Sequence, residues 1–179
     1  MGTFTLKPHP DTPPKAIHGV EVRWFEAKDG RLILRWQVKN VDAIQIPAFA
    51  GRGRADGLWQ TTCAELFLKD TQGNGYRELN FSPSGQWAAY RFTDYREGMI
   101  NALVMDPPEI SGSSGEYLYV LTASLDGSLL EEAAGAALSM VIEETDGTKS
   151  YWALAHPPGK PDFHHPACFT LSLPAASAS

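Results

Sequence analysis

Hydrophobic residues recur at every second position through much of this chain. The alternation is clearest in VEVRWFEA (20–27), LILRWQV (32–38) and EYLYVLTAS (116–124), and a period of two is typical of strands with one buried face. Shorter segments of similar character lie at 64–69, 76–82, 87–92, 138–144, 150–154 and 169–173. Turn-forming Gly, Asn, Asp and Pro residues separate many of these segments. The pattern therefore predicts an all-β fold, an antiparallel sandwich or barrel.

One stretch has a different character. The segment GSLLEEAAGAAL (127–138) is rich in Ala and places Ser128 three residues before Glu131. This spacing matches a capping box, in which a Ser side chain and a Glu side chain satisfy the first free N–H groups of a helix. The segment therefore predicts a single short helix between two strands.

Chain length and the remaining segments indicate the domain organisation. A chain of 179 residues suits one hydrophobic core and is short for two, so we expect a single domain over residues 1–179. Segment 93–115 contains two adjacent prolines and SGSSG and is expected to be mostly loop. Residues 1–15, which include four prolines, and residues 174–179 are expected to be poorly ordered.

Charge and hydropathy argue against two classes of partner. The formal net charge is −6 and the sequence has no basic patch, which argues against nucleic-acid binding. Its apolar runs are too short to span a bilayer, and its N-terminal segment lacks the basic-then-apolar order of a secretory signal. We therefore expect a cytoplasmic protein with no membrane partner, in which Cys63 and Cys168 are free thiols.

The turn at 73–75 suggests how two strands pair. If the flanking strands form a hairpin around this turn, Leu66 lies opposite Leu79 and Glu65 lies opposite Asn80, on opposite faces of the sheet. Apolar residues then meet apolar residues, and polar residues meet polar residues.

The next hairpin has two possible registers, and a slip of one residue exchanges its two faces. Placing Arg91 beneath the aliphatic side chains would bury a charge without a partner. We therefore expect Ala88, Tyr90 and Phe92 to face the interior. The opposite face then carries Glu65, Phe67, Glu78, Asn80, Trp87 and Arg91. This face is either a binding site or a set of solvated cross-strand pairs worth at most about 1 kcal/mol each.

Three segments of this sequence resemble a known family. LWQTTCAELFL (58–68), GYRELNFSPSGQWAAYRFTDYREGM (75–99) and SYWALAHPPGKPDFHHP (150–166) are similar to bacterial DOMON-like proteins, relatives of the family-nine carbohydrate-binding modules. The resemblance implies a jelly-roll-like β-sandwich with a ligand pocket. Members of this group bind sugars or, in an electron-transfer branch, haem.

The resemblance also implies residue roles. In the sugar-binding relatives two Trp side chains clamp a sugar ring. Trp59 matches the first clamp, and either Trp87 or Trp152 could be the second. Glu65 matches the acidic residue of the following strand, and Asn80 matches a polar position in the strand after it.

Sugar binding suits the residue types, because an indole stacks on the C–H face of a pyranose while carboxylate, amide and guanidinium groups bind its hydroxyls. The predicted ligand-binding residues are Trp59, Glu65, Glu78, Asn80, Trp87, Arg91, Arg96, Trp152 and His156. The sequence thus predicts non-catalytic binding of a small carbohydrate or sugar-like ligand, and this ligand could be anionic.

Other functions use overlapping residues. Haem would need an axial pair, for which Met99 with His156 or His164 are the candidates. Glu65 and Glu78 could instead act as the paired carboxylates of a glycoside hydrolase. The polar face could also be a protein-interaction surface without a small ligand. We expect no cofactor and no metal, because the histidines near 156–165 lack a fixed spacing for metal ligands. Ligand identity and oligomeric state stay open.

Overall fold

The computed structural model describes residues 2–173 and confirms the all-β class. Within these residues there is no α-helix, and four short 3-10 helices connect some of the strands. The strands are β1 (Gly2–Pro8), β2 (Gly19–Glu26), β3 (Arg31–Lys39), β4 (Gly53–Arg54), β5 (Cys63–Asp70), β6 (Tyr76–Phe81), β7 (Gln86–Phe92), β8 (Ile100–Asn101), β9 (Glu109–Ser114), β10 (Leu118–Asp126), β11 (Ala133–Glu143), β12 (Lys149–Ala153) and β13 (Leu171–Ser172). The 3-10 helices are η1 (Val41–Ala43), η2 (Leu58–Gln60), η3 (Gly127–Leu130) and η4 (Pro166–Cys168).

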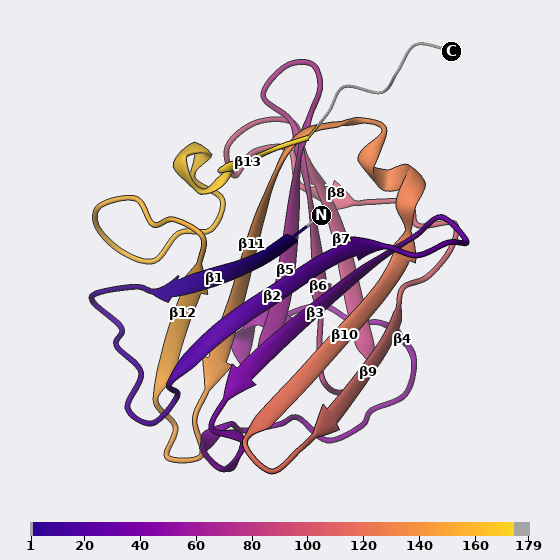
Figure 1. The fold of residues 1–179 in the computed structure, drawn as a ribbon. Coiled ribbons are helices and arrows are strands. Elements are labelled where there is room, and N and C mark those ends of the chain that lie inside the picture. Colours follow the sequence, from indigo (N-terminus) through magenta and orange to yellow (C-terminus); the bar gives the residue numbers. More distant parts are fainter. Residues whose placement is uncertain (1, 174–179) are drawn as a thin grey trace.

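The strands form one continuous, curled sheet (Figure 1). Its order is β4-β7-β6-β5-β11-β12-β1-β2-β3-β10-β9, with β13 on β11 and β8 on β7. Strand β1 joins the two halves, because its first part pairs with β2 while Lys7 and Pro8 pair with β12. The sheet is mixed, since β4 runs parallel to β7. The sequence suggested two antiparallel sheets; the assignment as a jelly roll stays a prediction.

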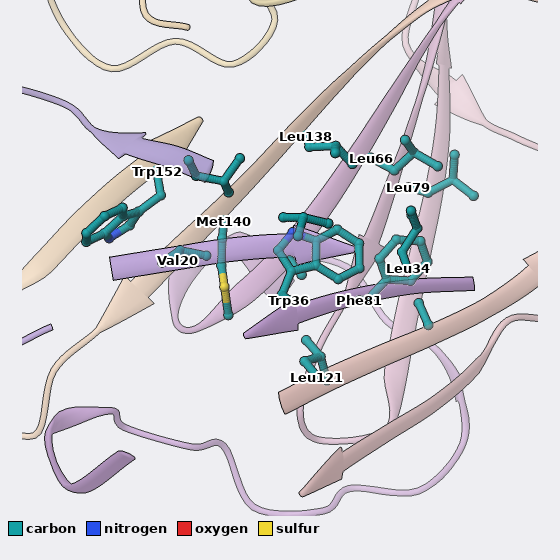
Figure 2. Close-up of a cluster of buried hydrophobic side chains, with 14 of the residues drawn as sticks. Val20, Leu34, Trp36, Leu66, Leu79, Phe81, Leu121, Leu138, Met140 and Trp152 are labelled. Atoms are coloured by element: carbon teal, nitrogen blue, oxygen red, sulfur yellow. The ribbon is translucent and has the colours of Figure 1, made fainter. Parts of the chain in front are cut away.

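The main core lies between the two halves of the curled sheet (Figure 2). Trp36 from β3 and Leu121 from β10 belong to the same buried cluster as Leu66, Phe81 and Leu138 from the other half. The Trp36 Nε1–H also donates to the backbone oxygen of Ser139 in β11, at 3.2 Å, so one side chain links both halves.

The helix predicted within 127–138 is wrong. The segment forms η3, whose N-cap is Asp126 rather than Ser128: the Asp126 carboxylate accepts from the Ser128 backbone N–H at 3.0 Å. Strand β11 then begins at Ala133 and pairs with β5 and β13. The Ala-rich sequence favours a helix locally, but strand pairing on both sides and burial of Leu138 outweigh that weak preference.

Two segments expected to lack regular structure contain strands. Residues 2–8 within the segment 1–15 form β1, whose Leu6 is buried in the core. Segment 93–115 contains β8 and the edge strand β9, which pairs with β10. Pro8 is the last residue of β1, and Pro107 and Pro108 precede β9, so these prolines occupy strand ends, where they are tolerated. Residues 174–179 lie outside the described residues.

The first predicted register is confirmed and the second is wrong. Glu65 pairs with Asn80 as expected. In the next hairpin, however, Phe81 pairs with Trp87, which places Trp87 and Ala89 on the core face. Arg91 is not buried by this register: it lies at the exposed end of the face, where its Nη2 is 3.1 Å from Asp70 Oδ2. The predicted register is wrong because burial is not uniform along this face: Ala89 is buried, whereas the Arg91 side chain is half exposed.

Candidate functional site

The face of β5, β6 and β7 that points away from the main core is covered by other parts of the chain. Its covering layer includes η2 and residues from the segment that follows β12, and together they form a second buried cluster. The cluster consists of Leu58, Cys63, Phe67, Tyr76, Ala88, Tyr90, Phe92, Ala137, Val141, Ala153, Phe163 and Cys168. The cysteines in it, Cys63 and Cys168, are free thiols as expected.

Because of this cover, the polar residues of the face are buried. Glu65, Glu78 and Asn80 are only 3%, 5% and 0% exposed. The interpretation of Glu65 and Glu78 as members of solvated cross-strand pairs is therefore wrong, whereas Arg91 is exposed and lies 3.1 Å from Asp70. The same burial means that Glu65, Glu78 and Asn80 do not form an open surface for a protein partner.

A cavity of about 410 Å³ lies within this covered region, inside the range of about 300–1,000 Å³ usual for small-molecule sites. Its lining residues are Trp59, Glu65, Glu78, Tyr90, Phe92, Arg96, Met99, Val141, Tyr151, Pro161, Phe163 and His164. Aromatic rings make up much of the wall, with two carboxyl groups, one guanidinium group and one imidazole among them. Four of the predicted site residues, Trp59, Glu65, Glu78 and Arg96, thus come together.

Trp59 lies in η2, a single turn that begins after Gly57. Gly57 has a φ of +74°, in the left-handed region that glycine adopts without strain. The Trp59 ring is 42% exposed and meets Tyr90 edge-on, with ring centroids 6.1 Å apart. Because the Tyr90 hydroxyl donates to Asp56 at 2.6 Å, the Tyr90 ring is fixed beside the indole. The pair presents aromatic surface to the cavity.

Glu65 and Glu78 supply the two carboxyl groups. Glu78 Oε1 accepts a 2.8 Å hydrogen bond from Asn80 Nδ2, whereas Glu65 Oε2 has a long 3.5 Å contact with Ser139 Oγ. Burial raises the pKa of Glu65 well above its usual value, and the nearby Glu78 charge raises it further. Burial also raises the pKa of Glu78, opposed by the Asn80 hydrogen bond and by Arg96. Glu65 therefore holds a proton to higher pH than a solvated glutamate does.

Arg96 belongs to the loop after β7 and connects it to the loop after β12. Its Nη2 lies 2.7 Å from Asp162 Oδ1, and the Tyr95 hydroxyl also donates to Asp162. Asp162 Oδ1, the oxygen that pairs with Arg96, also accepts the His164 backbone N–H at 3.1 Å. Arg96 has a φ of +56°, a conformation uncommon for a residue with a side chain. These contacts fix the two loops together at the cavity and give Arg96 its own counter-charge.

His164 faces Glu78 across the cavity wall. Tyr76 Oη accepts from the Arg96 backbone N–H at 3.2 Å and lies 2.8 Å from His164 Nδ1. If the Tyr76 hydroxyl donates to Nδ1, the imidazole carries its hydrogen on Nε2, which is 3.7 Å from Glu78 Oε2. Burial, and then the Arg96 charge, lower the pKa of His164 to about 4, so the ring is neutral at pH 7.

Three of the predicted site residues lie on β6 or β7 but do not line the cavity. Asn80 is behind Glu78, which its amide orients. Trp87 packs against the main core, with the Arg54 guanidinium 5.9 Å from its ring centroid. Arg91 is paired with Asp70.

Two further predicted residues belong to other parts of the packing. Trp152 lies in the main core, where its Nε1–H donates to Ser150 Oγ at 2.9 Å. His156 Nε2 is 2.8 Å from the Lys7 backbone oxygen, so this ring attaches the loop after β12 to β1. Neither Trp87 nor Trp152 can therefore form a second clamp opposite Trp59.

Sequence reasoning missed most of the aromatic wall. Tyr90 and Phe92 were assigned to the wrong face through the register error. Tyr151 alternates with the buried Trp152 in β12, and this alternation is the signal that places Tyr151 on the opposite face. Phe163 lies in a proline-rich loop, where the sequence carries no periodic signal.

Two classes of feature are absent from the described part of the chain. Residues 2–173 contain no group of three or more His, Cys, Asp or Glu residues placed to hold a metal ion. No helix in that range is long and apolar enough to cross a membrane.

Comparison with known proteins yields a similarity of fold. No protein-family model and no curated protein sequence matches this chain. Among solved structures, the crystal structure of a "putative carbohydrate-binding protein" from Bacteroides uniformis superposes with a TM-score of 0.68. The match covers 94% of this chain and 84% of that chain at 18% sequence identity. At this identity the similarity demonstrates a shared fold.

Proposed function

We propose that this protein binds a small carbohydrate, without catalysis, in the cavity that Trp59, Glu65 and Glu78 line. The observation that carries the proposal is that an accessible indole and two buried carboxyl groups open onto one volume of about 410 Å³. A pyranose has a C–H face that packs on aromatic rings and an edge of hydroxyls that pairs with carboxyl and guanidinium groups. The family-nine resemblance and the name of the Bacteroides uniformis structure support the same ligand class.

The name of the Bacteroides uniformis structure supports binding rather than hydrolysis. Burial raises the pKa of Glu78, whereas the Asn80 hydrogen bond and Arg96 favour its ionised form; burial and then Glu78 raise the pKa of Glu65. A glycoside hydrolase also pairs a protonated carboxyl group with an ionised one, so a turnover screen tests this pair directly. From the neighbour's name we expect no turnover in a screen of chromogenic glycosides. Release of the chromophore that disappears in Glu78→Gln would contradict this.

Haem does not fit the residues present. Met99 and His164 both line the cavity, but an axial imidazole must offer an unprotonated nitrogen to the iron. Both ring nitrogens of His164 already face protein groups: Nδ1 lies 2.8 Å from the Tyr76 hydroxyl and Nε2 lies 3.7 Å from Glu78 Oε2. We expect no Soret band with features of axial ligation after haem addition to the purified protein.

Calorimetry with mono- and disaccharides, uronic acids included, tests the sugar proposal. We expect at least one sugar to bind with a dissociation constant between about 1 mM and 1 μM, which corresponds to about −4 to −8 kcal/mol. Trp59→Ala should weaken that binding about tenfold or more, since it removes the stacking surface.

Trp87→Ala is the matched control, because Trp87 lies on the opposite face of the same sheet. It should leave the dissociation constant within about twofold while the protein stays folded by circular dichroism. A loss of binding in Trp87→Ala with none in Trp59→Ala, or no heat with any sugar of the panel, would refute the proposed site.

A further inference from the structure

The charges around the cavity do not balance. Two carboxyl groups, Glu65 and Glu78, reach its lining. Of the basic groups in the same lining, Arg96 is already paired with Asp162 at 2.7 Å, and His164 is held neutral at pH 7. Within the described lining residues, neither carboxyl group therefore has a cation of its own.

Glu65 has the weaker set of partners. Glu65 is only 3% exposed. Within residues 2–173 its side chain accepts one hydrogen bond, the long 3.5 Å contact from Ser139 Oγ. Buried carboxyl groups without good donors are costly to the folded state. A donor that enters through the cavity would complete this set.

The walls of the cavity favour a cation rather than a neutral donor. Trp59, Tyr90, Phe92, Tyr151 and Phe163 contribute rings to the lining. The face of an aromatic ring is electrostatically negative and attracts ammonium groups, more strongly where water is excluded. A positive charge beside the two carboxyl groups would also favour their ionised forms. Rings and carboxyl groups therefore both favour a cationic ligand.

We propose that the sugar bound in this cavity carries a protonated amino group, which lies against Glu65 and Glu78. The inference rests on the proposed function and narrows its ligand class to amino sugars. An anionic sugar, such as a uronic acid, would bring a third carboxylate beside the existing pair and should bind worst.

Matched hexoses test this inference. Each of glucosamine, galactosamine and mannosamine is compared by calorimetry, at pH 6.5, with its neutral parent sugar and its N-acetyl derivative. We expect at least one amino sugar to bind about tenfold or more tightly than both neutral counterparts. In Glu65→Gln and Glu78→Gln the ratio of the two dissociation constants, neutral parent over amine, should fall below about threefold, because the amide carries no charge. The ratio is taken within each variant, so a change in the parent sugar's own affinity does not enter it.

The outcomes separate the two levels of the proposal. If a neutral sugar binds as tightly as its amine and Trp59→Ala still abolishes binding, the amino-sugar inference is overturned and the sugar site stands. If neither amino nor neutral sugars bind, both fall. An amine preference that survives unchanged in both Gln variants would also overturn the assignment to these carboxyl groups. Thermal melts of each variant establish that the comparison is made on folded protein.

Discussion

Trp36→Ala is expected to lower the free energy of unfolding by about 3–5 kcal/mol, the usual range for removing a buried Trp from a core. Trp36 is fully buried between the two halves of the sheet, and its ring centroid lies 5.8 Å from that of Phe81 (Figure 2). The variant loses these contacts and leaves a cavity between β3 and β11, which rigid strands cannot collapse to fill. Urea unfolding followed by fluorescence or circular dichroism measures the change.

Two comparisons sharpen this prediction. Trp36→Phe keeps much of the volume but removes the hydrogen bond to Ser139, so its loss should be smaller than that of Trp36→Ala. Tyr117→Ala, at a side chain that is 71% exposed, should change stability by at most about 0.5 kcal/mol. A loss of less than about 1 kcal/mol in Trp36→Ala would mean that this ring does not hold the two halves together.

Glu65→Gln is expected to make the protein more stable at pH 8. The pKa of Glu65 is raised well above its usual value in the folded state, first by burial and then by Glu78. Between the unfolded pKa of about 4.3 and the raised folded pKa, the folded protein binds more protons than the unfolded chain. The free energy of unfolding therefore falls as pH rises through this window.

The amide at position 65 has no proton to lose, so the variant should not show this fall. We expect the free energy of unfolding of Glu65→Gln to exceed that of the natural protein by little near pH 4.5. The difference should grow with pH and reach about 1–3 kcal/mol at pH 8, the usual desolvation cost of a poorly paired buried group. Urea unfolding at pH 4.5, 6, 7 and 8 measures the difference.

His164 also makes stability depend on pH, but it lowers the free energy of unfolding as pH falls rather than as pH rises. Its pKa is lowered to about 4, so the unfolded chain binds the extra proton and stability is lost as pH falls below about 6.5. Taking the difference between Glu65→Gln and the natural protein cancels this contribution. Glu116→Gln, at an exposed glutamate, should show no growing advantage. An equal pH dependence in all three proteins would show that the Glu65 carboxyl is not buried as described.

These predictions link stability to binding. A carboxyl group that destabilises the folded protein at neutral pH is the same group that the proposed amino sugar would contact. We therefore expect Glu65→Gln to gain stability and lose amine preference together, a common trade-off at sites built for ligands.

The sequence by itself determined the features that depend on short-range pattern. Its alternation predicted the longer strands other than β1 and β9, and the 73–75 turn determined that Glu65 lies opposite Asn80. A hairpin with a defined turn has few registers, so local information is sufficient there. Four of the nine predicted site residues, Trp59, Glu65, Glu78 and Arg96, line one cavity, and their role in binding stays a prediction.

Only the tertiary structure decided which faces are covered. Trp87 and Tyr90 exchange sides through one residue of register. This register buries no unpaired charge, because Arg91 lies at the exposed end of the face beside Asp70 of another strand. Residues 133–138 have the local preferences of a helix, yet neighbours on both sides make them a strand. The segment that carries Phe163 and His164 packs over a polar sheet face and encloses part of it as a cavity. This contact joins residues far apart in the sequence, so no periodic pattern predicts it.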